Sequence, residues 1–303
     1  MRPGSGVLSQ LRRIGADALP DGLRELSRPL AGLWCLGDPA ALNGAPRRHV
    51  AIVGTREASP YGIRVAERLA TACAEAGLVV VSGLARGVDA AAHRAALAVG
   101  GATIGVQGTG VDVPYPASHR ALHDALCRQG TVISEMEPGT TASPGCFPRR
   151  NRIIAALCHV TVVVEAGYKS GAINTASQAL ELGRVVAAVP GRIDEERAAG
   201  SNSLIRDGAQ VITEAADLLN LFELSTFSSA QHRAASATAM WQGPAWSGEA
   251  STKSSNDLGR KPDLQVIEED GNVPFRRVAT DILLRELSGR LERDGLDYRE
   301  SRG

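Results

Sequence analysis

The chain has 303 residues, of which 44% are apolar and 4% aromatic. This composition indicates a soluble globular protein of one or two domains whose core rests on Val, Ile, Leu and Ala. With 33 Lys and Arg against 33 Asp and Glu, the chain has no bulk positive field, so a nucleic acid would have to bind through a local basic patch.

The sequence divides into three parts. Residues 1–46 are a short lead-in segment, expected to pack on the main domain. Residues 47–222 alternate apolar runs with segments of helical period and form the main domain. In the tail, 223–303, residues 225–262 are rich in Ser, Ala, Gln and Gly and indicate a disordered linker, whereas 276–294 predict one helix.

Six apolar runs in the main domain predict strands. Each is short, rich in Val and Ile, and closed by Gly or a polar residue, as seen at 49–54, 78–83, 102–108, 130–135, 160–166 and 185–191. Helical patterns lie between them. The alternation predicts an α/β fold: a Rossmann-like, doubly wound, mostly parallel sheet with helices on both faces. Ligands of such sheets bind beyond the carboxyl ends of the strands.

The loop after the first of these strands predicts an anion site. Gly54 allows close backbone approach, Thr55 and Ser59 offer hydroxyls, and Arg56 offers a guanidinium just before a helix that begins near Tyr61. Because Arg56 replaces the second glycine of G-x-G-x-x-G, the loop does not favour a dinucleotide. A tight turn with a solvated Arg56 is the alternative reading of the same residues.

The next two loops are less specific. Gly83 and Arg86 form a tight basic loop, and Asp89 with His93 one turn later could either do acid–base chemistry or tie the helix down. The loop at 108–119 carries two Gly and two Pro, which indicates a rigid structural loop with a possible ligand edge.

The segment after the fourth strand carries the strongest signal. A long loop at 136–148 ends in Phe147, and Arg149, Arg150, Asn151 and Arg152 follow at a helix start. Cations at a helix N-terminus are unfavourable unless an anion binds there. We therefore expect the arginines to bind phosphate and Phe147 to stack on a base. The alternative is that the arginines pair with acids and Phe147 belongs to the core.

The loop after the fifth strand repeats this chemistry with Lys169, Ser170 and Gly171 before a helix, although the Walker A spacing is absent. Fourteen residues are thus expected to bind DNA: Gly54, Thr55, Arg56, Ser59, Gly83, Arg86, Phe147, Arg149, Arg150, Asn151, Arg152, Lys169, Ser170 and Gly171. We expect no cofactor and no metal site, because His119 and His123 are spaced i, i+4 on what should be a solvated helix face without a third ligand.

Taken in order, these loops resemble the DNA-processing protein family DprA/Smf. The matching stretches include VGTREASPYG, SGLARGVDAAAH, FPRRNRIIAAL and VVVEAGYKSGAINTASQALELGR. The matching stretches cover about 170 residues within 47–222, and the lead-in also resembles the segment that precedes the fold in that family. One departure is SGAINTA, in which Asn174 takes a normally apolar place. The family's N-terminal helical and C-terminal winged-helix modules are not recognisable.

The resemblance implies a homodimeric, non-enzymatic protein that binds single-stranded DNA, protects incoming strands and helps to load the recombinase RecA during natural transformation. It implies that Arg56 grips phosphate, that the segment from Phe147 to Arg152 contacts the backbone and stacks on bases, and that the loop at Lys169, Ser170 and Gly171 lines the pocket. The alternative is a phosphoribohydrolase-like enzyme acting on nucleotides, with Asp89, Glu135 and Glu165 as candidate carboxylates.

The cysteines and the absence of apolar spans indicate where the protein works. Five cysteines are widely spaced, odd in number and without a C-x-x-C pair, which favours reduced thiols. No apolar run approaches the ~18 residues of a membrane span. We therefore expect a cytoplasmic protein with no membrane contact.

Overall fold

The computed structural model describes residues 11–42, 49–143, 145–223, 291–294 and 297–300. The chain divides into two units, residues 1–239 and 240–303. In the second unit, the strands β10 (Leu291–Asp294) and β11 (Asp297–Glu300) pair antiparallel. The linker expected at 225–262 lies outside the described residues, as does the helix expected at 276–294 apart from the four residues of β10.

The first unit is built on one nine-stranded sheet with the order β1-β2-β6-β5-β4-β3-β7-β8-β9. All pairs from β6 to β9 in that order are parallel. Six of these strands coincide with the six predicted runs: β3 (His49–Val53), β4 (Val79–Ser82), β5 (Thr103–Gln107), β6 (Thr131–Ser134), β7 (Val160–Val163) and β8 (Val185–Ala188). The predicted doubly wound fold is therefore confirmed.

Three further strands extend this sheet beyond the predicted ones. β9 (Gln210–Val211) adds to β8 at one edge. At the other edge, the lead-in supplies β1 (Arg12–Gly15) and β2 (Gly32–Gly37), and β2 runs antiparallel to β6 with Cys35 opposite Ile133. The lead-in is thus continuous with the sheet through main-chain hydrogen bonds.

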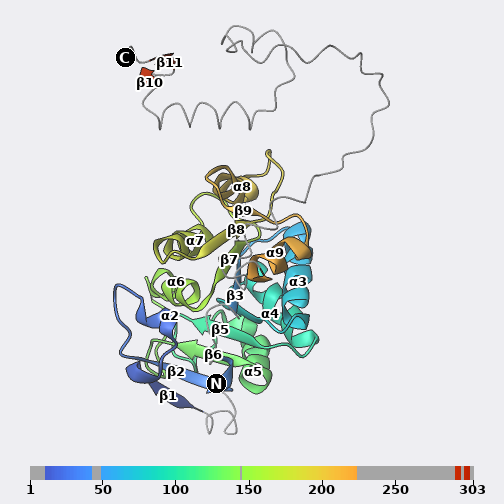
Figure 1. Cartoon of the computed structure of the whole chain (residues 1–303). Coiled ribbons are helices and arrows are strands. Elements are labelled where there is room, and N and C mark those ends of the chain that lie inside the picture. The colour runs from blue at the N-terminus through green and yellow to red at the C-terminus, as the bar shows by residue number, and fades with distance from the viewer. Residues whose placement is uncertain (1–10, 43–48, 144, 224–290, 295–296, 301–303) are drawn as a thin grey trace. The chain divides into compact units, whose positions relative to one another are not determined.

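Helices cover both faces of this sheet (Figure 1). One face carries α3 (Pro60–Glu75), α4 (Val88–Ala98), α5 (Arg120–Gln129) and α9 (Ala215–Glu223), and the other carries α2 (Asp21–Arg24), α6 (Cys146–Leu157), α7 (Gly171–Glu181) and α8 (Ala199–Arg206).

The central strands are apolar throughout because both of their faces are covered. Along β3, Val50 and Ile52 pack toward α3 and α4, whereas Ala51 and Val53 pack toward α6 and α7. Within the described residues, no helix combines the length and apolar character that crossing a bilayer requires.

Candidate functional site

The strand order reverses between β3 and β7, and a cleft lies at this switch point. Successive strands run outward from β3 through β4 to β6 on one side and from β7 to β9 on the other. The loops at the carboxyl ends therefore diverge here and leave a cleft of about 610 Å³. We call it the switch-point cleft, and nine of the predicted residues line it: Gly54, Thr55, Arg56, Arg86, Phe147, Arg150, Asn151, Ser170 and Gly171.

A smaller cavity of about 200 Å³ adjoins this cleft and shares Arg56, Arg86, Phe147 and Arg150 with it. We call it the Phe147 cavity. The predicted Gly83 lines it, and so do Gln107 and Tyr115.

Arg56 and Phe147 form the wall between the two cavities. The Arg56 guanidinium carbon lies 5.2 Å from the Phe147 ring centroid, and the Tyr115 ring lies 4.9 Å away on a tilted geometry. Phe147 is half-buried and Arg56 is exposed. The site therefore presents an aromatic ring and a planar cation side by side.

Arg150 is buried beneath this wall. Its Nη1 donates to the carbonyl oxygens of Gly83 and Val106, at the ends of β4 and β5. A Cβ on Gly83 would collide with the guanidinium, so a larger residue there would force Arg150 to move. The Asp89 carboxylate, also buried, accepts from the Gly83 and Ala85 N–H groups at 3.0 and 3.4 Å.

Arg150 and Asp89 form no direct ion pair among the described residues, but the charge of each affects the pKa of the other. Burial lowers the pKa of Arg150 to about 10, while the charge of Asp89 opposes that shift. Burial raises the pKa of Asp89, opposed first by the charge of Arg150. Arg150 therefore stays charged at neutral pH and ties three elements together under the cleft.

The other two arginines of the segment turn away from the cleft toward Glu135. Arg149 donates to both Glu135 oxygens at 3.0 and 2.9 Å, and Arg152 donates to Glu135 at 2.7 Å and to the Arg28 carbonyl at 2.7 Å. Burial alone would raise the pKa of Glu135, but the two arginines outweigh it and lower that pKa. The acid-pairing alternative for these two residues is therefore what the structure shows.

The N-terminus of α7 forms the far wall of the switch-point cleft. Ser170 caps this helix, its Oγ accepting from the Ile173 N–H at 3.3 Å. The positive end of the helix dipole therefore faces the cleft. Asn151 Nδ2 donates to the Gly171 carbonyl and to Asn174 Oδ1, both at 3.1 Å. Lys169 is exposed beside this wall, in a groove shared with Thr55 and Ser170.

Ser59 lies apart from this cleft and caps α3. Its Oγ accepts from the Gly62 N–H at 3.0 Å, and its own N–H donates to Glu165 at 2.8 Å. The Glu165 carboxylate thus occupies the position at the α3 N-terminus where the sequence predicted a ligand anion.

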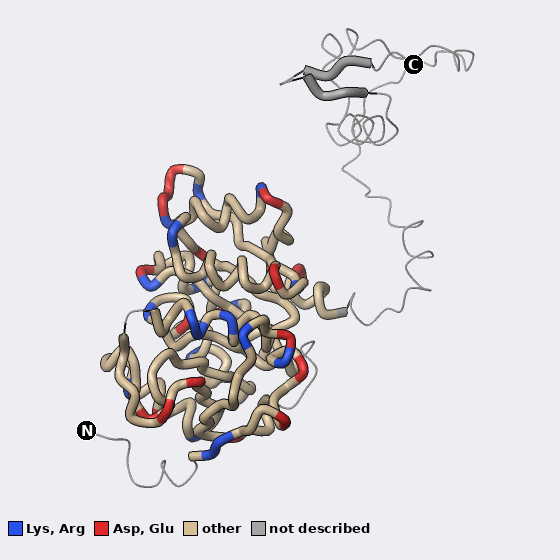
Figure 2. Tube along the Cα trace, turned by 90° about the vertical axis from the view of Figure 1, so that its left-hand side faces the viewer, with Lys and Arg blue, Asp and Glu red and all other residues tan. Residues whose placement is uncertain are grey.

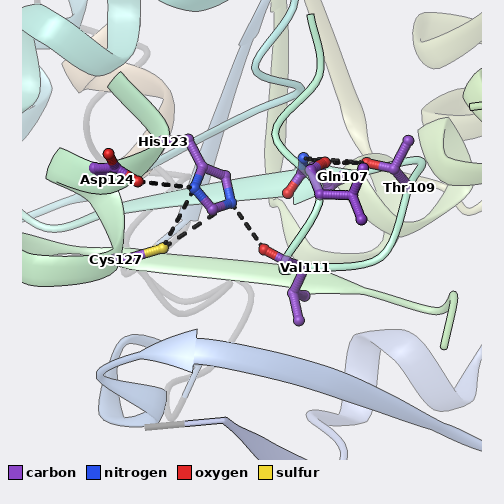
Figure 3. A network of polar contacts seen from close by, with 7 residues as sticks. Gln107, Thr109, Val111, His123, Asp124 and Cys127 are labelled. Carbon is purple, nitrogen blue, oxygen red and sulfur yellow. Dashed lines mark hydrogen bonds and ion pairs between the residues drawn. The ribbon is translucent and has the colours of Figure 1, made fainter. Parts of the chain in front are cut away.

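The histidines considered as functional candidates, His93, His119 and His123, are buried in the fold. His93 Nδ1 lies 2.7 Å from Thr103 Oγ1, and burial lowers its pKa to about 3. The expectation of a solvated His119 and His123 was wrong. Both are buried, because their rings turn inward and bond to carbonyl groups of neighbouring loops. His119, the residue before α5, has Nδ1 at 3.0 Å from the Leu84 carbonyl oxygen. His123, on α5, has Nε2 at 2.8 Å from the Val111 carbonyl oxygen (Figure 3). Across the described part of the chain, no three His, Cys, Asp or Glu side chains gather as a metal site would require.

Basic positions gather across the middle of the first unit, interleaved with a few acidic ones (Figure 2). Of the ion pairs formed within the described ranges, none involves Arg56, Arg86 or Lys169. All three are exposed. These three cations at the site are therefore open to an anionic ligand.

The residues that line the site without having been predicted as ligand-binding groups include Gln107, Tyr115 and Asn174. Gln107 is the last residue of β5, and a polar residue at a strand end was the available signal. Tyr115 comes to Phe147 only through the course of its loop.

The chain is similar to a known protein family and to curated proteins. Residues 10–223 match the family described as DNA recombination-mediator protein A. A relative from Mycobacterium tuberculosis is 47% identical over 205 residues, covering 68% of this chain and 51% of the relative. DNA processing protein DprA of Streptococcus pneumoniae is 45% identical over 174 residues, covering 57% of this chain and 61% of that protein. The chain thus spans about half to three-fifths of the length of these curated relatives.

Two solved structures are similar to this chain over most of its described length. DNA processing protein A from Streptococcus pneumoniae superposes with a TM-score of 0.66 at 38% identity, covering 71% of this chain and 76% of that one. DNA processing protein A from Helicobacter pylori, studied for its single-stranded DNA binding mode, gives a TM-score of 0.65 at 31% identity, covering 71% of this chain and 97% of that one.

Proposed function

Because this chain belongs to the DNA recombination-mediator protein A family, we propose that it binds single-stranded DNA in the switch-point cleft. The observation that carries the proposal is the Arg56 guanidinium beside the Phe147 ring at the mouth of the cleft. Phosphate oxygens would accept from Arg56, Arg86 and Lys169 and from the first N–H groups of α7. A base would stack on Phe147.

The H. pylori relative, with its single-stranded DNA binding mode, supports this reading. The duplex is disfavoured because a paired base cannot leave its partner to reach Phe147 without an unpairing cost. The zero net charge of the chain further limits binding to the local cation cluster.

The test is a fluorescence anisotropy titration with a labelled single-stranded oligonucleotide and with the matching duplex, each at two salt concentrations. We expect the single strand to bind more tightly, with a salt dependence set by a few phosphate contacts. Equal affinity for both forms would contradict the proposal.

We further propose that the protein is a cytoplasmic homodimer that protects incoming strands and passes them to RecA, and that it acts without catalysis. The support is family membership together with the exposed cations Arg56, Arg86 and Lys169. Sedimentation analysis tests the dimer. A RecA filament assay on single-stranded DNA, with and without this protein, tests the transfer, and unchanged filament formation would contradict it.

The carboxylates of the nucleotide-hydrolase alternative have structural partners. Glu135 pairs with Arg149 and Arg152, Glu165 accepts from the Ser59 N–H, and Asp89 accepts from the loop after β4. These contacts give the three carboxylates structural roles. Release of free base from nucleoside monophosphates by the protein would favour the hydrolase alternative instead.

A further inference from the structure

The loop that carries Arg56 is held at both ends by one residue, Glu165. This loop, residues 55–59, joins β3 to α3. At its start, the Thr55 N–H donates to the Glu165 main-chain carbonyl at 2.7 Å. At its end, the Ser59 N–H donates to the Glu165 carboxylate at 2.8 Å. Glu165 lies two residues beyond β7 and is 5% exposed, so the loop is tied to the end of the neighbouring strand across the switch point.

The two ends of this loop depend on Glu165 in different ways. The start is fixed by main-chain hydrogen bonds, because the Thr55 carbonyl also accepts from the Val88 N–H at 3.3 Å. A change of the Glu165 side chain leaves these main-chain groups in place. The end of the loop is tied to β7 by the carboxylate itself, which a substitution can remove. Arg56 lies between these two anchors.

The carboxylate takes a place that a residue of the helix itself usually fills. In a capping box, the third residue of a helix is Glu or Gln, and its side chain accepts from the N–H of the capping residue. Ser59 caps α3, and the third residue of that helix is Gly62. A Cβ on Gly62 would come within 2.4 Å of Glu165 Oε2, so the carboxylate occupies the space of a local side chain. The start of α3 is thus tied to a residue 106 positions away.

A carboxylate at this place has a cost for a DNA-binding protein. Its negative charge lies against the loop that presents Arg56, and of the ion pairs formed within the described ranges none involves Glu165. A negative charge beside a phosphate-binding loop repels the ligand. Capping of α3 alone does not require this residue, since a Glu or Gln on the helix would accept from the same N–H. What the remote carboxylate adds is a fixed course for the loop.

On the premise of the proposed DNA binding, we propose that Glu165 is a positioning residue for Arg56. By holding both ends of the loop, it keeps the Arg56 guanidinium 5.2 Å from the centroid of the Phe147 ring, where a phosphate and a base of one strand would lie together. Without the carboxylate, the end of the loop shifts and the guanidinium loses its fixed place beside the ring. More freedom is then lost on binding, so the affinity falls.

The test compares two substitutions that remove the same charge. Glu165→Gln keeps an oxygen that can accept from the Ser59 N–H, whereas Glu165→Met has a similar length and no such acceptor. Labelled oligothymidylate is titrated with each variant by fluorescence anisotropy. Glu165→Gln should bind at least as tightly as the wild type. Glu165→Met should bind about five- to tenfold more weakly than Glu165→Gln, the fold-change that corresponds to one hydrogen bond.

Replacement of Arg56 separates positioning from a general loss of stability. If Glu165 acts through Arg56, then Glu165→Gln and Glu165→Met should bind DNA equally when each is combined with Arg56→Ala. A general loss of folded protein would instead keep the difference between them. Ser59→Ala is the matched control, because it removes the side-chain cap of α3 and keeps the N–H that Glu165 accepts. Its DNA affinity should equal that of the wild type.

A second variant removes the same hydrogen bond from the side of the loop. Ser59→Pro has no N–H, and the Ser59 φ of −67° suits proline. Since this variant also loses the side-chain cap, its reference is Ser59→Ala. Ser59→Pro should bind oligothymidylate about five- to tenfold more weakly than Ser59→Ala. This comparison decides the matter if Glu165→Met folds poorly.

The outcomes separate the two proposals. If the wild type binds no oligothymidylate, the DNA-binding function itself fails. If the wild type binds and Glu165→Met binds as tightly as Glu165→Gln, DNA binding stands and the positioning role of Glu165 is overturned. A difference between these two variants that persists together with Arg56→Ala overturns it as well, and so does equal binding by Ser59→Pro and Ser59→Ala.

Discussion

The Arg56 guanidinium lies 5.2 Å from the centre of the Phe147 ring, although Arg56 follows β3 and Phe147 belongs to α6. A cation and an aromatic face held together match the two chemical parts of a nucleotide, its phosphate and its base. The contact also restricts Arg56 before a ligand arrives, which lowers the entropy lost on binding.

Replacement of Arg56 should weaken single-stranded DNA binding for every base composition. Arg56→Ala removes one phosphate contact, so the slope of log K against log salt should flatten by about one charge equivalent. Anisotropy titrations over a range of salt concentrations measure both. The matched control is Arg68→Ala, an exposed arginine on α3 outside the cleft. An unchanged slope for Arg56→Ala would remove this residue from the phosphate contacts.

Phe147→Ala should weaken DNA binding by about 1–3 kcal/mol, the contribution of one stacked base. Phe147→Tyr keeps the ring and should retain most of the affinity. Both values follow from the same titration at one salt concentration. Equal losses in the two variants would mean that the ring acts by packing and not by stacking on a base.

Arg150 should matter for stability more than its neighbour Arg149. Arg150→Met leaves the buried carbonyl oxygens of Gly83 and Val106 without their donor and removes a charge that favours the ionised form of Asp89, so we expect a loss of about 2–6 kcal/mol in the free energy of unfolding. Arg149→Met breaks a pair whose arginine side chain is 50% exposed, so it should cost about 0–1 kcal/mol. Urea unfolding measures both, and similar small losses would contradict the framework role of Arg150.

Ser59 should affect folding and leave DNA binding unchanged. Ser59→Ala removes the cap of α3 and should lower the free energy of unfolding by about 0.5–2 kcal/mol, whereas Ser59→Asn can still cap. DNA affinity should be the same in both variants. If Ser59→Ala instead loses affinity at full stability, Ser59 contacts DNA as the sequence predicted.

Stability should fall as the pH drops below about 6.5, in part through His93. The pKa of His93 is lowered to about 3 by burial, with the nearby charge of Arg150 adding to the effect. Between these two pH values the unfolded chain binds a proton that the folded chain does not, so the free energy of unfolding rises with pH by up to ~1.4 kcal/mol per unit and levels off above 6.5.

His93→Asn should remove that contribution. Urea unfolding from pH 5 to 8 should show a shallower slope for the variant below pH 6.5 and parallel curves above pH 7. Identical slopes below pH 6.5 would show that His93 titrates alike in the folded and unfolded chain.

The sequence alone was sufficient to predict six strands of the main sheet and the protein family. Strands covered on both faces must be apolar throughout, so six of them stood out as short Val- and Ile-rich runs, and the DprA/Smf resemblance is confirmed. β1, β2 and β9 were not predicted: β1 and β9 are edge strands of four and two residues, and β2 pairs with β6, which lies far away in the chain.

Within the site, the sequence by itself determined that arginines, hydroxyls and glycines would lie at the carboxyl ends of the strands, since that follows from chain order in a parallel sheet. Only the tertiary structure decided which arginines stay free. Arg149 and Arg152 pair with Glu135, Arg150 is buried and donates to the Gly83 and Val106 carbonyls, and Arg56 remains open beside Phe147. Charge pairing depends on distances between segments remote in sequence, which no local pattern encodes.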